Sequence, residues 1–149
     1  MKNKLQQWVD NGWLQPQSSS REEIEKLLET VERDFNDVKA PVSVDNKFII
    51  IYRALIALCT VLARSSGYRV ERDNHHYRSI QILRLILGDK YSLREKYFQN
   101  CRKKRHELTY EMVGTVTGAN VEELVKALRE LQKDVIVWLE DNHPDLISP

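Results

Sequence analysis

The hydrophobic positions of the chain recur at intervals of three and four residues, the period of an amphipathic α-helix. The clearest stripe lies within residues 20–41, where acidic and polar side chains fill the positions between the apolar ones. Ser20 followed by Glu23 predicts a capping box at its start, and Pro41 predicts its end. The apolar members of the stripe are Ile24, Leu27, Leu28, Val31, Phe35 and Val38.

The most apolar stretch, Phe48–Ala63, is hydrophobic nearly all round and shows no alternation of period two. We predict a helix that is capped by Ser43 or Asp45 and closed at Gly67. Because no face of it is polar, it should be the buried core helix of a bundle. The stretch is too short to span a bilayer and contains Arg53, so we expect no membrane segment.

The same spacing predicts four further helices, joined by short connections that favour antiparallel neighbours. They are expected over residues 3–14, from Asp73 or Asn74 to Gly88, from near Ser92 to about Met112, and, after a loop VGTVTGAN, from a cap at Asn120 and Glu123 to just before Pro144. The sequence therefore predicts an all-α fold, an antiparallel helical bundle of about five to six helices. We expect a single domain over residues 1–149, with helices in residues 3–38 packed on a core of about residues 43–140.

Composition narrows the class of protein. Hydrophobic residues make up 42% and charged residues 30%, as in a globular domain, and 5 Gly with 4 Pro disfavour an all-β fold. A net charge of +1 means that only a local patch could bind nucleic acid. Cys59 and Cys101 form no C-x-x-C pair, and the N-terminus has no apolar signal core. These features predict a cytoplasmic protein with reduced thiols.

Candidate chemistry concentrates in residues 97–112, YFQNCRKKRHELTYEM. At 100° per residue this helix has one apolar face and one adjoining polar arc. The face expected to be buried carries Tyr97, Cys101, Leu108 and Met112. The adjoining arc carries Arg105, Thr109, Arg102, His106 and Tyr110. A basic, hydroxyl-bearing stripe is thus predicted beside the core, although a flank of solvated Lys and Arg would show the same run.

A guanidinium, an imidazole and a phenol are the groups needed to bind a phosphodiester and to move protons. We therefore take Arg105, His106 and Tyr110 as candidate catalytic residues. The candidates for RNA binding are Arg102, Lys103 and Lys104. His75 and His76 are adjacent, so their rings diverge by about 100° on a helix and no metal site is expected. With no glycine-rich phosphate loop in the chain, no cofactor is expected either.

The chain resembles the HEPN family (higher eukaryotes and prokaryotes nucleotide-binding) over about residues 43–140. The resemblance lies in the long apolar helix ending in SSGYRV, in NHHYRSIQIL, and in RKKRHELTYE before a last amphipathic helix. The family signature is an Arg, a polar residue, and usually a His four to six residues after the Arg. Arg105 and His106 match its start, and Tyr110 stands in place of the usual His, as in a branch of the family.

The resemblance implies a HEPN-like four-helix core that forms a homodimer, with the motifs of two chains facing each other. Catalytic members of the family cut RNA without a metal, using the ribose 2′-hydroxyl as the nucleophile, and others are non-catalytic. Many prokaryotic members are toxins paired with a nucleotidyltransferase-like antitoxin. For the dimer of this chain we expect the Arg105–Tyr110 stripes to line an open cleft, with Phe98 and Tyr97 in the seam beside it.

Three functions stay open at this point. In a metal-independent endoribonuclease, Arg105 would hold the scissile phosphate, His106 would move a proton, and Tyr110 would bind the phosphate or the ribose. In a binding module, the same groove would hold RNA or a nucleotide without cutting it. In an interaction protein, the bundle would serve to be held by a partner such as an antitoxin.

Overall fold

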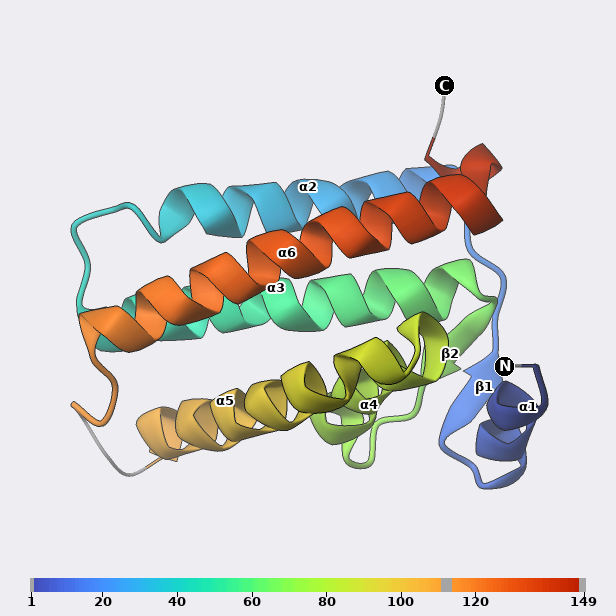
Figure 1. Ribbon diagram of the computed structural model, residues 1–149, viewed down its shortest axis with the longest axis horizontal. Helices are drawn as coiled ribbons and strands as arrows, with labels where there is room; N and C mark the ends of the chain where they lie inside the picture. Colours follow the sequence, from blue (N-terminus) through green and yellow to red (C-terminus); the bar gives the residue numbers. More distant parts are fainter. Residues whose placement is uncertain (1, 111–113, 148–149) are drawn as a thin grey trace.

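The structure, a computed structural model that describes residues 2–110 and 114–147, arranges its α-helices in layers around α3 (Figure 1). Helices α2 and α6 lie on one side of α3, and α4 and α5 lie on the other. The all-α bundle expected from the sequence is confirmed. The α-helices are α1 (Lys2–Asp10), α2 (Arg21–Asp37), α3 (Val44–Ser65), α4 (His75–Leu87), α5 (Ser92–Tyr110) and α6 (Gly118–Asn142). The short elements are strands β1 (Leu14–Pro16) and β2 (Tyr68–Val70) and 3₁₀ helices η1 (Asp89–Tyr91) and η2 (Pro144–Leu146).

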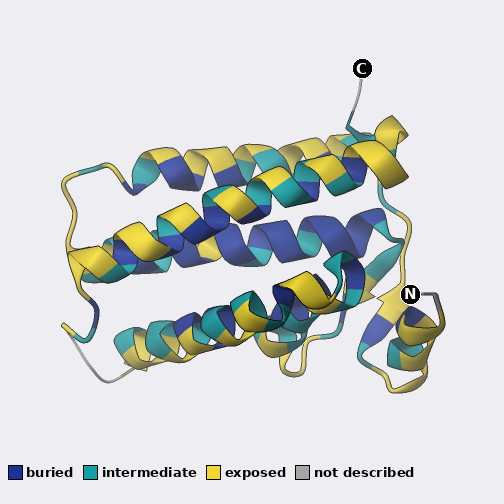
Figure 2. Cartoon of the chain, in the orientation of Figure 1, coloured by how far each residue is buried: buried dark blue, intermediate teal, exposed yellow. Residues whose placement is uncertain are grey.

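Helix α3 is the core of the bundle. Thirteen of its 22 residues are buried, and Figure 2 shows dark blue along the middle and the C-terminal part of the helix. At 22 residues the helix is longer than the apolar stretch in the sequence and could cross a membrane by length and composition alone. However, 72% of its most apolar window is buried by the rest of the protein. The neighbouring helices thus cover the apolar surface that the sequence places on every side of α3.

The predicted N-caps of α2 and α3 are confirmed. The Ser20 hydroxyl accepts a hydrogen bond from the backbone N–H of Glu23 at 3.2 Å, and the Ser43 hydroxyl accepts one from that of Asn46 at 3.1 Å. These bonds satisfy N–H groups that have no partner inside the helix. The predicted capping box at Ser20 is only half formed, because the Glu23 carboxylate is turned to Arg64 instead.

The start of α6 differs from the prediction. Thr117, not Asn120, is the N-cap, so the helix begins three residues earlier than a cap at Asn120 would place it. The Thr117 hydroxyl accepts from the Asn120 backbone N–H at 3.1 Å, and the Asn120 side chain accepts from the Thr117 N–H at 3.0 Å. Asn120 therefore completes a capping box from inside the helix, a role that its residue type alone does not distinguish from that of the cap.

The first helix is shorter than the predicted residues 3–14. It ends at Asp10, and Gly12, with φ of 78°, turns the chain into β1 (Leu14–Pro16). This strand pairs antiparallel with β2 (Tyr68–Val70), just after α3. Three-residue strands carry too little alternation to be read from the sequence, and their pairing joins segments more than fifty residues apart. The sheet ties the N-terminal helix to the end of α3.

A buried arginine fastens the same corner of the bundle. Arg64, near the end of α3, is 6% exposed, and its guanidinium binds both carboxylate oxygens of Glu23 on α2. It also donates to the backbone carbonyls of Gln17 at 3.1 Å, Ser18 at 2.9 Å and Tyr68 at 3.4 Å. The planar guanidinium of Arg64 therefore supplies hydrogen bonds to carbonyl groups of the linker before α2 and of the start of β2, and to a carboxylate of α2.

Asp34 is a buried carboxylate between α2 and α3. One of its oxygens accepts from Arg53 at 2.9 Å, and the other has no hydrogen-bond partner in the described part of the chain. Burial raises the pKa of Asp34 above its ordinary value of 3.8, although the charge of Arg53 opposes this shift. A raised carboxyl pKa means that the folded state favours the protonated form, so the ionised Asp34 lowers stability at neutral pH.

We predict that Arg64→Leu lowers the free energy of unfolding by about 3 kcal/mol, because it leaves a carboxylate and several carbonyl groups without their shared donor. The free energy of unfolding of Arg64→Lys should lie between those of the wild type and Arg64→Leu, since an ammonium keeps the charge but cannot reproduce the bidentate fork. Urea denaturation measures both. The control is Arg84→Leu, whose exposed ion pair with Asp89 should contribute less than about 1 kcal/mol. Equal losses for Arg64→Leu and Arg84→Leu would contradict the assigned role.

We also predict that Asp34→Asn raises the free energy of unfolding at pH 7, because it removes a buried charge and keeps an acceptor for Arg53. The stability that wild-type Asp34 contributes is present below the unfolded pKa and is lost as the pH rises through the raised folded value. The gain from Asp34→Asn should therefore be largest at pH 7 and disappear at acid pH. Urea denaturation across this range tests it, and a gain that is the same at every pH would refute the explanation.

Candidate functional site

The predicted basic run lies on α5, on the outside of the bundle next to α4 (Figure 1). Its four cations do not form one patch. Arg102 and Arg105 are half-buried and lean against aromatic rings of α4 and α3, respectively. Lys103 is exposed, whereas Lys104 lines a small cavity of about 170 Å³ that also includes Glu123 of α6. The run therefore divides into two inward-leaning guanidinium groups and two lysines.

His106 and Tyr110, the other predicted site residues, lie one helical turn apart on the outer surface of α5. Their ring centroids are 4.7 Å apart at an interplanar angle of 43°, and Tyr110 is 68% exposed. The guanidinium of Arg105 is turned inward, 5.7 Å from the ring centroid of Tyr52. The structure thus brings His106 and Tyr110 together and directs Arg105 towards a different set of side chains.

Arg105 belongs to a cluster drawn from three helices. Tyr52 on α3 is 1% exposed, and its hydroxyl lies 3.0 Å from Nδ1 of His76 on α4. Burial raises the pKa of Tyr52, so its hydroxyl keeps its proton. No other acceptor binds that hydroxyl among the described residues, and we therefore assign Tyr52 as the donor and Nδ1 as the acceptor. A neutral His76 then carries its proton on Nε2 and can donate it to a ligand.

His76 is held in the neutral form. Burial lowers the pKa of His76 to about 4, and the charge of Arg105 adds to this effect, followed by smaller contributions from His75 and Arg102. Burial also lowers the pKa of His75. Because protonation of His76 would place a third positive charge beside two guanidinium groups, the cluster keeps a neutral donor next to two fixed cations.

Gln99 positions the second guanidinium. The residue is 8% exposed, and its side-chain N–H donates to the backbone carbonyl of Tyr77 at 3.0 Å. Its side-chain oxygen accepts from Nε of Arg102 at 2.8 Å. The guanidinium of Arg102 then lies 5.4 Å from the ring centroid of Tyr77. The buried amide of Gln99 thus links α5 to α4, and its hydrogen bond to Nε orients the guanidinium of Arg102.

Charge is separated across the bundle. Helices α4 and α5 together carry eight Lys or Arg and two Asp or Glu, whereas α2 and α6 carry six Lys or Arg and thirteen Asp or Glu. These pairs lie on opposite sides of α3 (Figure 1). The net charge of +1 therefore hides a basic side and an acidic side, and the candidate site lies on the basic one.

The guanidinium groups of the site lack acidic partners. Elsewhere, several arginines pair with carboxylates, as Arg94 does with Glu130 and Arg129 does with Glu32. In the described residues, no salt bridge involves Arg102 or Arg105. Half-buried cations that face aromatic rings without a carboxylate remain free to bind an external anion.

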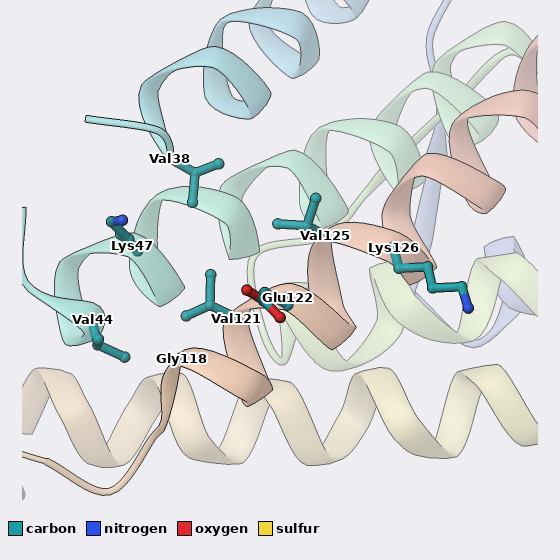
Figure 3. A pocket seen from close by; sticks show the side chains of 8 residues that line it. All are labelled: Val38, Val44, Lys47, Gly118, Val121, Glu122, Val125 and Lys126. Atoms are coloured by element: carbon teal, nitrogen blue, oxygen red, sulfur yellow. The ribbon is translucent and has the colours of Figure 1, made fainter. Parts of the chain in front are cut away.

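A second, apolar cavity of about 350 Å³ lies between the end of α2 and the starts of α3 and α6 (Figure 3). Val38, Val121 and Val125 line the space, and Lys126 extends away from it. Its lining includes Glu122, Lys47 and Lys126 but no aromatic, imidazole or hydroxyl group. The aromatic rings and the imidazole that accompany the guanidinium groups make the α4–α5 side the better candidate site.

Two expectations drawn from the sequence need correction or qualification. Phe98 is fully buried inside its own chain, so it cannot form the seam of a dimer as predicted. Of the face expected to be buried, Cys101 is buried, whereas Tyr97 and Leu108 are only half-buried. Met112 lies outside the described residues. The apolar face of α5 therefore packs into the protein itself.

Sequence reasoning missed three members of the site. Tyr52 sits in the apolar core stretch, His76 was considered only as a metal ligand, and Gln99 was not singled out. The ring centroids of His75 and His76 are 5.8 Å apart, and the described residues contain no group of three His, Cys, Asp or Glu that could hold a metal ion. A polar tyrosine within a core helix was the one signal in the sequence that a buried partner must exist.

Comparison of the chain with protein-family models, curated proteins and solved structures gave no match. The HEPN resemblance therefore stays a prediction.

We predict that His76 titrates with an apparent pKa near 4 in the folded protein, measured from its imidazole signals by NMR. The sign follows from the lowered value: the stability that neutral His76 contributes is present above the ordinary pKa of 6.5 and is lost as the pH falls towards 4. Arg105→Ala should raise this pKa, and Lys103→Ala should leave it unchanged. An ordinary pKa that does not respond to Arg105→Ala would show that the two side chains do not meet in solution.

Proposed function

We propose that the protein binds RNA through its phosphates, on the basic side formed by α4 and α5. The observation that carries the proposal is the pair Arg102 and Arg105. Both guanidinium groups are held against aromatic rings and have no carboxylate partner in the described residues. A phosphodiester would supply the acceptors that this pair lacks.

The neutral His76 suits the same ligand. With its proton on Nε2, it would add a hydrogen-bond donor next to Arg105 without adding a third repelling charge. Gln99 and Tyr52 hold the donors from the buried side, so the site is organised before the ligand arrives. A site of this kind loses less conformational entropy on binding than free lysines would.

Cleavage of the bound RNA is a second candidate function, supported by the contact between His106 and Tyr110. These rings are exposed to solvent one turn along α5 from the inward-leaning Arg105. In a metal-independent endoribonuclease, a base takes the proton of the ribose 2′-hydroxyl, and the 2′-oxygen attacks phosphorus. The bond to the 5′-oxygen breaks, and an acid delivers a proton to that leaving oxygen. His106 is the accessible imidazole for these proton transfers.

Assembly rests on the resemblance alone. A two-fold homodimer and a nucleotidyltransferase-like antitoxin as partner stay predictions, as does a role as a protein-interaction bundle. A dimer seam would have to use side chains other than Phe98, and the exposed Leu93 and Tyr110 on α5 are the apolar residues available there. Such a seam would place two copies of the basic run near each other, where bound phosphate would reduce their repulsion.

We predict that a fluorescently labelled RNA oligonucleotide binds the wild type in EDTA and that its affinity falls as salt is added, because phosphate contacts release counterions. The double variant Arg102→Ala/Arg105→Ala should bind at least about tenfold more weakly and lower the slope of log K against log salt by about 1.4 for single-stranded RNA. Fluorescence anisotropy measures both quantities. The control is Lys133→Ala on the acidic side, which should bind as the wild type does.

Binding that is insensitive to salt, or that weakens equally in Lys133→Ala and in the double variant, would refute the phosphate site on α4 and α5.

A separate gel assay in EDTA tests cleavage. If the endoribonuclease proposal holds, the wild type produces fragments ending in a 2′,3′-cyclic phosphate, and both Arg105→Ala and His106→Ala reduce the rate by about 10²-fold or more. RNA that is bound yet stays intact would assign the protein to the binding class. Cleavage that continues in Arg105→Ala would exclude this site as its source.

A further inference from the structure

A row of aromatic rings and guanidinium groups runs from the N-terminal segment across α4 to α5. The rings of Trp8 and Trp13 meet edge to face at 5.5 Å, and the guanidinium of Arg78 lies 3.6 Å from the centroid of a Trp13 ring. The same guanidinium lies 5.2 Å from the Tyr77 ring, and that of Arg102 lies 5.4 Å from it on the α5 side. The row therefore ends at one of the two arginines proposed to bind phosphate.

Packing explains the first part of the row. The close stack of Arg78 on Trp13 fastens the N-terminal segment to α4, and Arg78 also donates to Gln81 at 3.1 Å. Such a contact stabilises the fold whatever the protein binds.

Packing explains Tyr77 only in part. The residue is 37% exposed and is not one of the buried residues of the hydrophobic core. The guanidinium groups of Arg78 and Arg102 are within cation–π range of its ring, yet neither approaches it as closely as Arg78 approaches Trp13. Tyr77 is thus a partly exposed ring whose neighbours are two guanidinium groups, and neither of them forms a salt bridge in the described residues.

We propose that Tyr77 is a stacking platform for an unpaired base of single-stranded RNA, whose phosphates are bound by Arg102 and Arg105. This inference rests on the proposed function and names its substrate class. Every base has a flat π-face that stacks on an aromatic ring, and alternating aromatic and guanidinium groups are the surface that single strands need. The platform lies on the basic side of the bundle, whose positive charge attracts the phosphates of the strand.

Single strands are favoured over duplexes by geometry. In an A-form duplex the base faces are stacked on one another and are closed to a protein side chain. The ring of Tyr77 would therefore find no base face to stack on. The side chains of α4 and α5 would meet only the phosphates of a duplex. An unpaired strand would present a base to Tyr77 and the adjoining phosphates to Arg102 and Arg105.

The test compares three probes of equal phosphate number on the protein: a 24-nucleotide oligouridine, the same backbone without bases, and a 12-base-pair duplex. We expect oligouridine to bind about tenfold more tightly than the abasic strand and than the duplex, a difference within the range of one stacked base. Tyr77→Leu should remove this preference and leave the salt dependence unchanged, because it loses no phosphate contact. Tyr77→Phe keeps the ring and should behave as the wild type.

The outcomes separate the two proposals. If no probe binds, the phosphate site itself is wrong and the platform with it. If the abasic strand or the duplex binds as tightly as oligouridine, RNA binding stands and the stacking platform is refuted. The comparison of probes uses the wild type alone, so it stays decisive even if Tyr77→Leu is found by thermal unfolding to be less stable.

Discussion

The structure depends on the burial of α3. Its apolar side chains point in several directions, so no single partner helix could remove them from water. Helices α2 and α6 cover α3 on one side, and α4 and α5 cover it on the other. Burial of hydrophobic surface contributes about 25 cal/mol per Å², which makes this central helix the main source of stability. The other helices need only one apolar stripe each, and their outer faces are free to carry charge.

Two buried polar side chains of α3 determine how neighbouring elements are placed against it. Arg64 is buried, and its guanidinium is satisfied by Glu23 and the linker carbonyls around it. Tyr52 is buried more completely, and its hydroxyl lies 3.0 Å from Nδ1 of His76 on the neighbouring helix. An unsatisfied polar group in this interior costs about 1–3 kcal/mol, so each of these residues fixes one neighbour in place. The same constraint therefore fastens the N-terminal corner and orients the candidate site.

The two sides of the bundle, which α3 separates, have opposite charge. Acidic residues gather on α2 and α6, and basic residues gather on α4 and α5. Within the acidic side, arginines such as Arg129 are paired with carboxylates, whereas Arg102 and Arg105 rest on aromatic rings instead. The resulting potential would steer an anionic ligand to one side of the molecule, an effect that a net charge of +1 conceals.

The sequence by itself determined most of each helix, since periodicity and caps are local: the stripe from Ile24 to Val38, the cap at Ser43 and the stop at Gly88 all lie where the pattern placed them. The end of α1 and the start of α6 are the exceptions. It also identified α5 as the carrier of the basic run. Only the tertiary structure decided which way each side chain of that run faces. Tyr52, His76 and Arg105 are separated along the chain by 24 residues or more, and no periodicity relates them. They meet because α4 and α5 pack on the same side of α3, and that packing reflects the burial of all the apolar surfaces together rather than any local pattern.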